Sequence, residues 1–216
     1  MSLKTLTEAE FLKSIAEHEM RVLRDDGVYR HLLFKRAQTQ DRYFELITTP
    51  GRLFYVGDMG DFAFERDKDM FNFFRTEPSE STQLPINVGY WHENLIMADT
   101  QGGSKEFDEV QVKSYVYQCL SDWLEGADSE DAQKIQEEVT ELLEEIGLEN
   151  NEHLILYALS SFDLTIGRHR LSFELWDAPS FNRPSHHFLW RLYAITWGIR
   201  QYDQFKAANE ERGCSE

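Results

Sequence analysis

The chain has 216 residues, of which 41% are hydrophobic and 13% aromatic, and its formal net charge is −17. This composition is enough for one sizeable hydrophobic core or two small ones, so we expect a folded globular protein. The charge disfavours nucleic acid as a direct ligand. The sequence also has no apolar signal core and no run of about 18 apolar residues, so we expect neither secretion nor a membrane span.

The N-terminal part combines a helix start with a series of strand patterns. Thr7 and Glu10 have the spacing of a capping box, which predicts an amphipathic helix over residues 7–24. Pro50-Gly51 has the residue order of a type II turn between two apolar runs. The runs rich in strand-forming residues are 28–35, 42–48, 53–56 and 62–65. Together they predict an antiparallel β-meander.

A short aromatic helix and a polar segment follow the predicted meander. Residues 67–75 have helical spacing, with Met70, Phe71 and Phe74 on one face, which is expected to pack on the sheet. Residues 76–85 are polar and turn-forming. We therefore predict an α+β fold in which residues 1–76 contain the sheet and residues 77–216 are mainly helical. A single continuous domain is the alternative.

The remainder of the chain has mainly helical patterns. The predicted helices cover residue 86 to the Gly102-Gly103 pair, then 106–124, 129–146, 151–163 and 185–208, with an extended segment at 171–176. A strand at the β-branched stretch Val110-Gln111-Val112 is the alternative there. The last helix is apolar over a wide arc, so it is expected to lie at the centre of the core.

The helix predicted over residues 129–146 is strongly acidic. Between Asp122 and Glu152 the chain has twelve carboxylates and a single base, Lys134, which is expected to pair with Glu138. Gly147 is expected to end the helix. One helix face contains the apolar residues Ile135, Val139, Leu142, Leu143 and Ile146. The opposite, solvent-facing side contains the candidate partner-binding residues Glu137, Glu138, Glu141, Glu144 and Glu145.

Two interpretations of this acidic face are open. The simpler one is a solvated helix surface. Exposed helices usually mix charges of both signs, however, and carboxylates four residues apart repel each other by a few tenths of a kcal/mol. Successive carboxylates on such a face are about 5–6 Å apart, which is comparable to the ~7 Å between phosphates of a nucleic-acid strand. The face could therefore occupy a basic surface that otherwise binds DNA or RNA.

A basic cluster offers a different kind of site. Arg168, His169 and Arg170 are consecutive, and with His186 and His187 they are candidate ligands for a phosphate or a nucleotide messenger. Internal ion pairing is the simpler expectation for these arginines because carboxylates are so abundant. The adjacent histidines are expected in the first turn of a helix, where they cannot both face one metal ion.

The sequence contains no pattern that specifies a reaction. Asp58 in the Gly57–Gly60 segment is expected to bond its own backbone as a turn residue. Cys119 is expected to be a core thiol and Cys214 an exposed one, without a disulfide. We found no glycine-rich phosphate loop, zinc-protease motif or nucleophile elbow. An enzyme is therefore disfavoured, and no catalytic residue, metal or cofactor is predicted.

Three motifs are similar to a family of small accessory proteins encoded by bacteriophages and prophages. They are Thr49-Pro50-Gly51-Arg52-Leu53 with Gly57-Asp58-Met59-Gly60, then Asp69-Met70-Phe71-Asn72-Phe73-Phe74-Arg75, and finally His187-Phe188-Leu189-Trp190 with residues 193–203. The acidic segment 122–152 is not part of the resemblance. The resemblance implies a phage accessory protein in the cytoplasm of a bacterial host.

These features lead to one main hypothesis and two alternatives. The main hypothesis is an acidic phage protein that binds and inhibits a host protein with a basic surface, such as a nucleic-acid-handling defence factor, by nucleic-acid mimicry. The first alternative is a protein that binds or cleaves a nucleotide messenger through the region from Arg168 to His187. The second is a phage structural or assembly component. The sequence does not indicate an oligomeric state.

Overall fold

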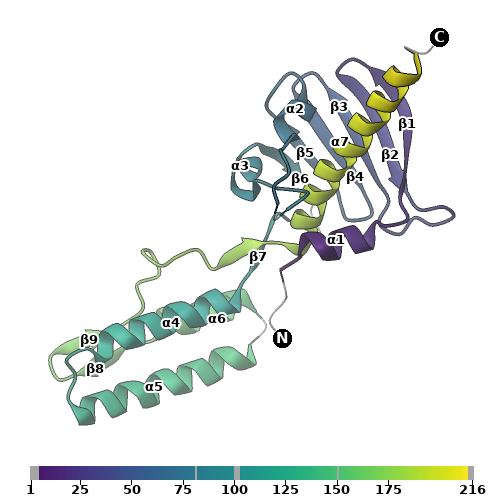
Figure 1. Ribbon diagram of the computed structural model, residues 1–216. Coiled ribbons are helices and arrows are strands. Elements are labelled where there is room, and N and C mark those ends of the chain that lie inside the picture. The colour runs from purple at the N-terminus through teal and green to yellow at the C-terminus, as the bar shows by residue number, and fades with distance from the viewer. Residues whose placement is uncertain (1–4, 81, 100–102, 150, 214–216) are drawn as a thin grey trace. The chain divides into compact units, whose positions relative to one another are not determined.

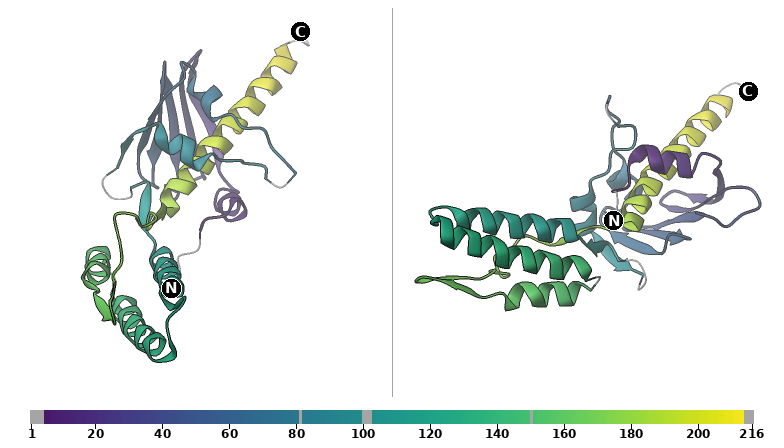
Figure 2. Two further views of the ribbon diagram at one scale, coloured as in Figure 1. Left: turned by 90° about the vertical axis from the view of Figure 1, so that its left-hand side faces the viewer. Right: turned by 90° about the horizontal axis from the view of Figure 1, so that it is seen from below.

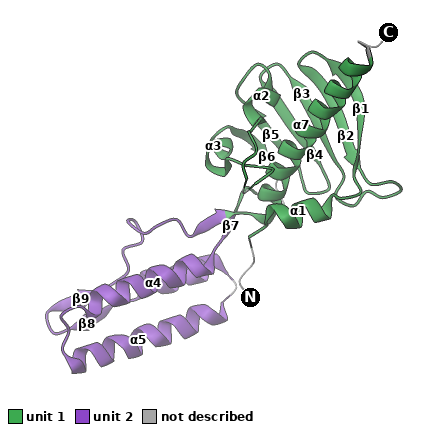
Figure 3. Cartoon of the chain, in the orientation of Figure 1, with its two compact units in different colours: residues 1, 3–105, 184–216 green, residues 2, 106–183 purple. Residues whose placement is uncertain are grey.

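The computed structural model describes residues 5–80, 82–99, 103–149 and 151–213 (Figure 1). Cys214 and the Gly102 end of the helix predicted from residue 86 lie outside these residues. The chain divides into two compact units (Figure 3). Unit 1 contains the residues up to Lys105 and those from Pro184 onward, and unit 2 is Glu106–Arg183. Unit 2 is thus an insertion in the sequence of unit 1.

Unit 1 contains a six-stranded antiparallel sheet in which each strand pairs with the next one along the chain. The predicted meander and the α+β class are therefore confirmed. Gly51, in the turn between the third and fourth strands, has a φ of 82°, as the second central residue of a type II turn requires. The strands are β1 (Glu19–Asp26), β2 (Tyr29–Lys35), β3 (Phe44–Thr49), β4 (Arg52–Gly57), β5 (Phe62–Glu65) and β6 (Leu95–Ala98).

The prediction of a helix over residues 7–24 is correct only for the first part of that range. Helix α1 spans Glu8–Ser14, and the Thr7–Glu10 capping box is present, with Thr7 N–H donating to Glu10 Oε2 at 3.0 Å. Residues 19–26 form β1 instead of a second half of the helix. Met20 and Val22 in β1 pack against the core, which is the two-residue period of a strand.

Three further helices complete unit 1. They are α2 (Met70–Phe74), α3 (Val88–Glu93) and α7 (His186–Gly213). The helix expected from residue 86 ends at Asn94, because the following residues pair with β5 as the sixth strand. The division expected near residue 76 lies inside unit 1, since β6 and α7 complete the same sheet and the same core as the N-terminal elements.

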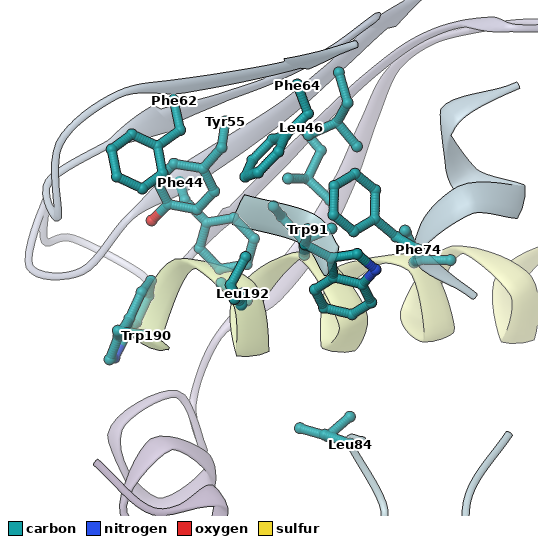
Figure 4. Packing of buried hydrophobic residues seen from close by; sticks show 14 of the residues in the cluster. Phe44, Leu46, Tyr55, Phe62, Phe64, Phe74, Leu84, Trp91, Trp190 and Leu192 are labelled. Carbon is teal, nitrogen blue, oxygen red and sulfur yellow. The ribbon is translucent and has the colours of Figure 1, made fainter. Parts of the chain in front are cut away.

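The core of unit 1 lies between the sheet and α7, which runs along one face of the sheet (Figure 2). Aromatic side chains from the sheet point toward the helix, among them Phe44 and Tyr55, and Trp190 and Leu192 approach them from α7 (Figure 4). The approach is close at Gly198, where an added Cβ would lie 2.9 Å from Leu46 Cδ1. The prediction of a central last helix is confirmed.

A buried arginine attaches the beginning of α7 to the sheet. The side chain of Arg191 is 0% exposed, and its Nη2 donates to Asp99 Oδ2 at 3.1 Å and its Nε to the Met59 carbonyl at 2.5 Å. The guanidinium also lies 3.8 Å from the centre of the Phe62 ring. Burial lowers the pKa of Arg191, and the Asp99 carboxylate opposes that shift. The ion pair and the ring contact offset part of the desolvation of the charge.

Unit 2 has a hydrophobic core of its own, formed by three helices and a hairpin. Helix α5 contacts both α4 and α6. The alternative of a strand at Val110-Gln111-Val112 is wrong, because these residues belong to α4, which begins at the N-cap Asp108. A different strand, β7, precedes the helix and pairs with β10 where the insertion starts and ends. The elements are β7 (Lys105–Phe107), α4 (Glu109–Leu124), α5 (Ser129–Leu148), α6 (Glu152–Ser161), β8 (Leu164–Ile166), β9 (His169–Leu171) and β10 (Asn182–Pro184).

Two local predictions in unit 2 need correction. Helix α5 continues through Gly147 to Leu148, and Glu149 is its C-cap, because Leu142 and Ile146 extend the buried stripe to the last turn. In the extended segment predicted at 171–176, Leu171 alone belongs to a strand. Within the residues that the structure describes, no helix is both long and apolar enough to cross a membrane.

Candidate functional site: the acidic face of α5

Most of the net charge of the chain belongs to unit 2. Residues 106–183 contain 18 Asp and Glu against 5 Lys and Arg, a net charge of −13 out of the total of −17. Unit 1 has 21 acidic and 17 basic residues, a net charge of −4. The negative potential of the protein therefore originates mainly from the inserted helical unit.

Helix α5 separates apolar and charged residues onto two faces. Its apolar stripe is buried, with Val139 0% and Ile146 3% exposed. The helix begins at the N-cap Asp128, whose Oδ1 accepts the backbone N–H groups of Glu130 and Asp131, both at 3.0 Å. The five predicted partner-binding residues are all exposed to solvent: Glu137, Glu138, Glu141, Glu144 and Glu145.

The carboxylates on the exposed face of α5 have no salt bridge to a base in the part of the chain that the structure describes. Among the described residues, no salt bridge involves these five glutamates, and the expected pair between Lys134 and Glu138 is not formed. Glu137 accepts a hydrogen bond from the uncharged Gln133 amide at 2.8 Å. Elsewhere in the chain, exposed carboxylates such as Asp163 and Asp203 are paired with arginines. The face therefore presents uncompensated negative charge to solvent.

A groove lies between α5 and α6 at the edge of this face. Its volume is about 440 Å³. One wall comes from α5 and the other from α6, where the side chain of Tyr157 is 70% exposed. The lining residues are Glu138, Glu141, Leu142, Glu145, Tyr157, Ala158, Ser161 and Phe162. The sequence analysis did not identify this groove, because Tyr157 could be assigned to the apolar face of α6 by its spacing.

The predicted basic cluster is divided between the two units. Arg168, His169 and Arg170 belong to the β8–β9 hairpin of unit 2, whereas His186 and His187 form the first turn of α7 in unit 1. The first-turn position expected for the two histidines is confirmed.

The internal ion pairing expected for the arginines is confirmed for Arg170. Arg170 donates to Asp163 through two hydrogen bonds of 2.9 and 2.6 Å. Arg183 pairs with Glu106 at 2.9 Å. These pairs use the guanidinium groups that an external phosphate would need.

The pocket beside the hairpin has an acidic lining. His169 and Arg170 line a hollow of about 480 Å³ together with four carboxylates, those of Asp122, Glu125, Asp128 and Asp131. Negative charge in such excess repels a phosphate group. The geometry therefore gives little support to a nucleotide site at these residues.

The remaining single-residue candidates have structural surroundings. Asp58 Oδ2 accepts the backbone N–H of Arg42 at 2.8 Å, so it joins two loops, whereas a bond to its own turn was expected. Burial raises the pKa of the half-buried Cys119 thiol, which disfavours a reactive thiolate. No group of three or more potential metal ligands occurs in the described part of the chain.

The fold and the site together define an α+β protein with an inserted acidic helical unit. Comparisons with known proteins found no matching family model, no matching curated protein and no matching solved structure. The functional argument is therefore based on the geometry and charge described above.

Proposed function

We propose that this protein is a non-enzymatic interaction protein that binds a basic surface of another protein through the acidic face of α5. The observation that supports the proposal is the set of five exposed glutamates without a salt-bridge partner among the described residues. Their mutual repulsion makes α5 less stable than a helix with mixed charges. A cationic partner would convert this unfavourable term into binding energy.

The chemistry of the face matches a surface that normally binds nucleic-acid phosphates. The glutamates lie on one rigid helix at intervals of about 5–6 Å, and a basic groove for DNA or RNA accepts negative charges of similar spacing. We therefore propose a nucleic-acid-handling protein as the partner. The resemblance to phage accessory proteins supports a host defence factor as the particular target, with inhibition by nucleic-acid mimicry as the effect.

The experiment is affinity capture from a bacterial host lysate at low salt with elution by rising salt. The wild-type protein is expected to retain a basic nucleic-acid-binding protein, because electrostatic association weakens as screening increases. The variant Glu137→Gln, Glu141→Gln, Glu144→Gln, Glu145→Gln is expected to lose that partner. Duplex DNA should displace the partner from the wild-type protein, since both would occupy the same surface.

A control variant with the same change of charge makes the test specific. Four exposed acidic residues of unit 1, Glu77, Glu80, Glu93 and Glu210, can be replaced by glutamine in the same way. This variant should retain the partner. Equal retention by both variants would reject the acidic face of α5 as the binding surface, and equal loss would mean that net charge alone determines binding.

The two alternatives have less support but can be tested cheaply. A nucleotide messenger bound at 100 times its dissociation constant would add about 2.7 kcal/mol to the stability, so the absence of a thermal shift would exclude a bound nucleotide. A phage assembly component would self-associate, which light scattering measures.

A further inference from the structure

We propose that the groove between α5 and α6 is the anchoring site of the partner and that it takes an arginine side chain from a basic segment. This inference rests on the proposed function, which supplies the cationic partner. The proposed function uses the whole acidic face, whereas this inference assigns the specific contact to one side of α5, formed by Glu138, Glu141 and Glu145. The outward-facing Glu137 and Glu144 do not line the groove.

The two walls of the groove have complementary properties. On α5, Glu138, Glu141 and Glu145 follow one another at three and four residues, so their carboxylates form a row along the rim. Leu142, Ala158 and Phe162 supply the apolar lining of the groove. A ligand that fits must therefore combine an apolar body with a positively charged end.

Exposed apolar side chains on α6 provide an observation that is independent of the charge. Tyr157 is 70% exposed and Leu154, one turn before it, is 49% exposed. Tyrosine is one of the residue types enriched at interaction hot spots, which lie in pockets that a partner buries. The acidic row therefore borders a surface that a partner can also bury.

Arginine satisfies these requirements better than the alternatives. Its aliphatic part can cover Leu142 and Ala158, its planar guanidinium can stack on Tyr157, and its fork of donors can bind two oxygens of a glutamate. Lysine has the charge but neither the plane nor the fork. An anionic or neutral ligand would leave the three glutamates unpaired.

The test compares two double variants that remove the same charge from the same helix. One is Glu138→Gln with Glu145→Gln, in the groove, and the other is Glu137→Gln with Glu144→Gln, outside it. The probe is a fluorescent peptide of about ten residues that is rich in arginine, and its dissociation constant is measured by anisotropy. The groove variant is expected to weaken binding by about tenfold and the outer variant by about twofold, because direct charged hydrogen bonds are lost only in the first.

A second pair of variants tests the aromatic contact without changing the charge. Tyr157→Ala should weaken binding of the arginine peptide several-fold. Tyr117→Ala, at a position on α4 that is 57% exposed and does not line the groove, should have no effect. A matched lysine peptide should bind less tightly to the wild-type protein. All four replaced side chains of the double variants and both tyrosines are exposed, so the fold is expected to persist, which circular dichroism can verify.

Equal effects of the two double variants, together with no effect of Tyr157→Ala, would overturn the proposed groove site. The result would remain distinct from a failure of the proposed function. If the captured host partner is lost with both double variants to the same extent, the acidic face binds without the groove. If that partner is retained even by the quadruple variant Glu137→Gln, Glu141→Gln, Glu144→Gln, Glu145→Gln, the proposed function itself fails.

Discussion

Replacing Glu141 by glutamine is expected to stabilise the protein while weakening the binding of its partner. Four carboxylates lie three or four residues from Glu141 on the same helix, those of Glu137, Glu138, Glu144 and Glu145. Each like-charged pair costs about 0.2–0.5 kcal/mol in a helix at low salt. Because the pairs are exposed and partly screened, we expect the variant to gain about 1 kcal/mol in the free energy of unfolding.

Urea unfolding at two salt concentrations measures this gain. At low ionic strength the repulsion is present, whereas at 1 M salt the Debye length falls to about 3 Å and the repulsion is screened. The difference between variant and wild type should therefore largely disappear at high salt. The control is Glu130→Gln, in the first turn of α5, where a carboxylate is favoured by the helix dipole. That variant should be neutral or slightly destabilised.

Loss of stability in Glu141→Gln at low salt would refute this reasoning. It would mean that Glu141 has a favourable cationic neighbour in the folded protein and that the face is electrostatically compensated. A gain that persisted unchanged at 1 M salt would also contradict it, because the cause would then be helix propensity or packing.

Three further predictions concern the stability of unit 1. Thr7→Ala removes the capping box of α1 and should cost about 1 kcal/mol in urea unfolding. Leu192→Ala opens a cavity beneath the sheet at a fully buried position and should cost about 2–5 kcal/mol in the same assay. Burial alone would raise the pKa of Asp69, but hydrogen bonds from the Arg30 guanidinium and the Phe71 backbone outweigh it, so the pKa is lowered from 3.8. A carboxyl group whose pKa is lowered in the folded state stabilises the protein at pH values above its unfolded-state pKa, and this stabilisation is lost as the pH falls through its folded-state pKa. Asp69→Asn should therefore flatten the loss of stability below about pH 4.

Each of these predictions has a matched control. Thr7→Ser keeps the hydroxyl cap, and Leu192→Met keeps most of the buried volume, so both should retain most of the stability. Asp163 also has a lowered pKa because of its hydrogen bonds from Arg170, but the pair is exposed and screened by solvent. Asp163→Asn should therefore leave the loss of stability at low pH unchanged. An equal change in Asp69→Asn and Asp163→Asn would contradict the importance of the partly buried Arg30–Asp69 pair.

The sequence predicted the parts of the fold in which local pattern and tertiary packing agree. Strands β2 to β4 alternate in burial along the chain, and β5 is a short apolar run. All four are rich in strand-forming residues and are bounded by polar or turn-forming segments, so their local pattern was sufficient. The apolar stripe of α5 likewise has a helical period, and its buried and exposed residues follow the prediction.

The errors occur where pairing with a neighbouring strand decides the structure. Strand β1 is mostly charged, and its extended conformation results from its ladder with β2 and from the inward-facing Met20 and Val22. Strand β6 has only four residues, and its position at the sheet edge depends on β5. Neither ladder can be read from the local sequence, because the partner strand is specified elsewhere in the chain.

The candidate site was predicted in composition but not in shape. The exposed glutamates follow from the period of α5 alone. The groove depends on how α6 packs against α5 and on the side of α6 that presents Tyr157, which the sequence of α6 leaves open since Leu154, Ile155 and Leu159 are all apolar. The uneven division of net charge between the two units could not be predicted from the sequence either, because unit 1 is formed from two separate segments of the chain.

The insertion allows the acidic surface to vary independently of the core of unit 1. Its two ends meet in the β7–β10 sheet, where Asp108 N–H also donates to the Phe181 carbonyl at 2.7 Å. The two hydrophobic clusters have no residue in common. Repulsion among the glutamates of α5 therefore acts on the stability of unit 2, while the core between the sheet and α7 is unaffected. An unfavourable surface is tolerated more easily in such an insertion than on α7, whose side chains hold the core of unit 1 together.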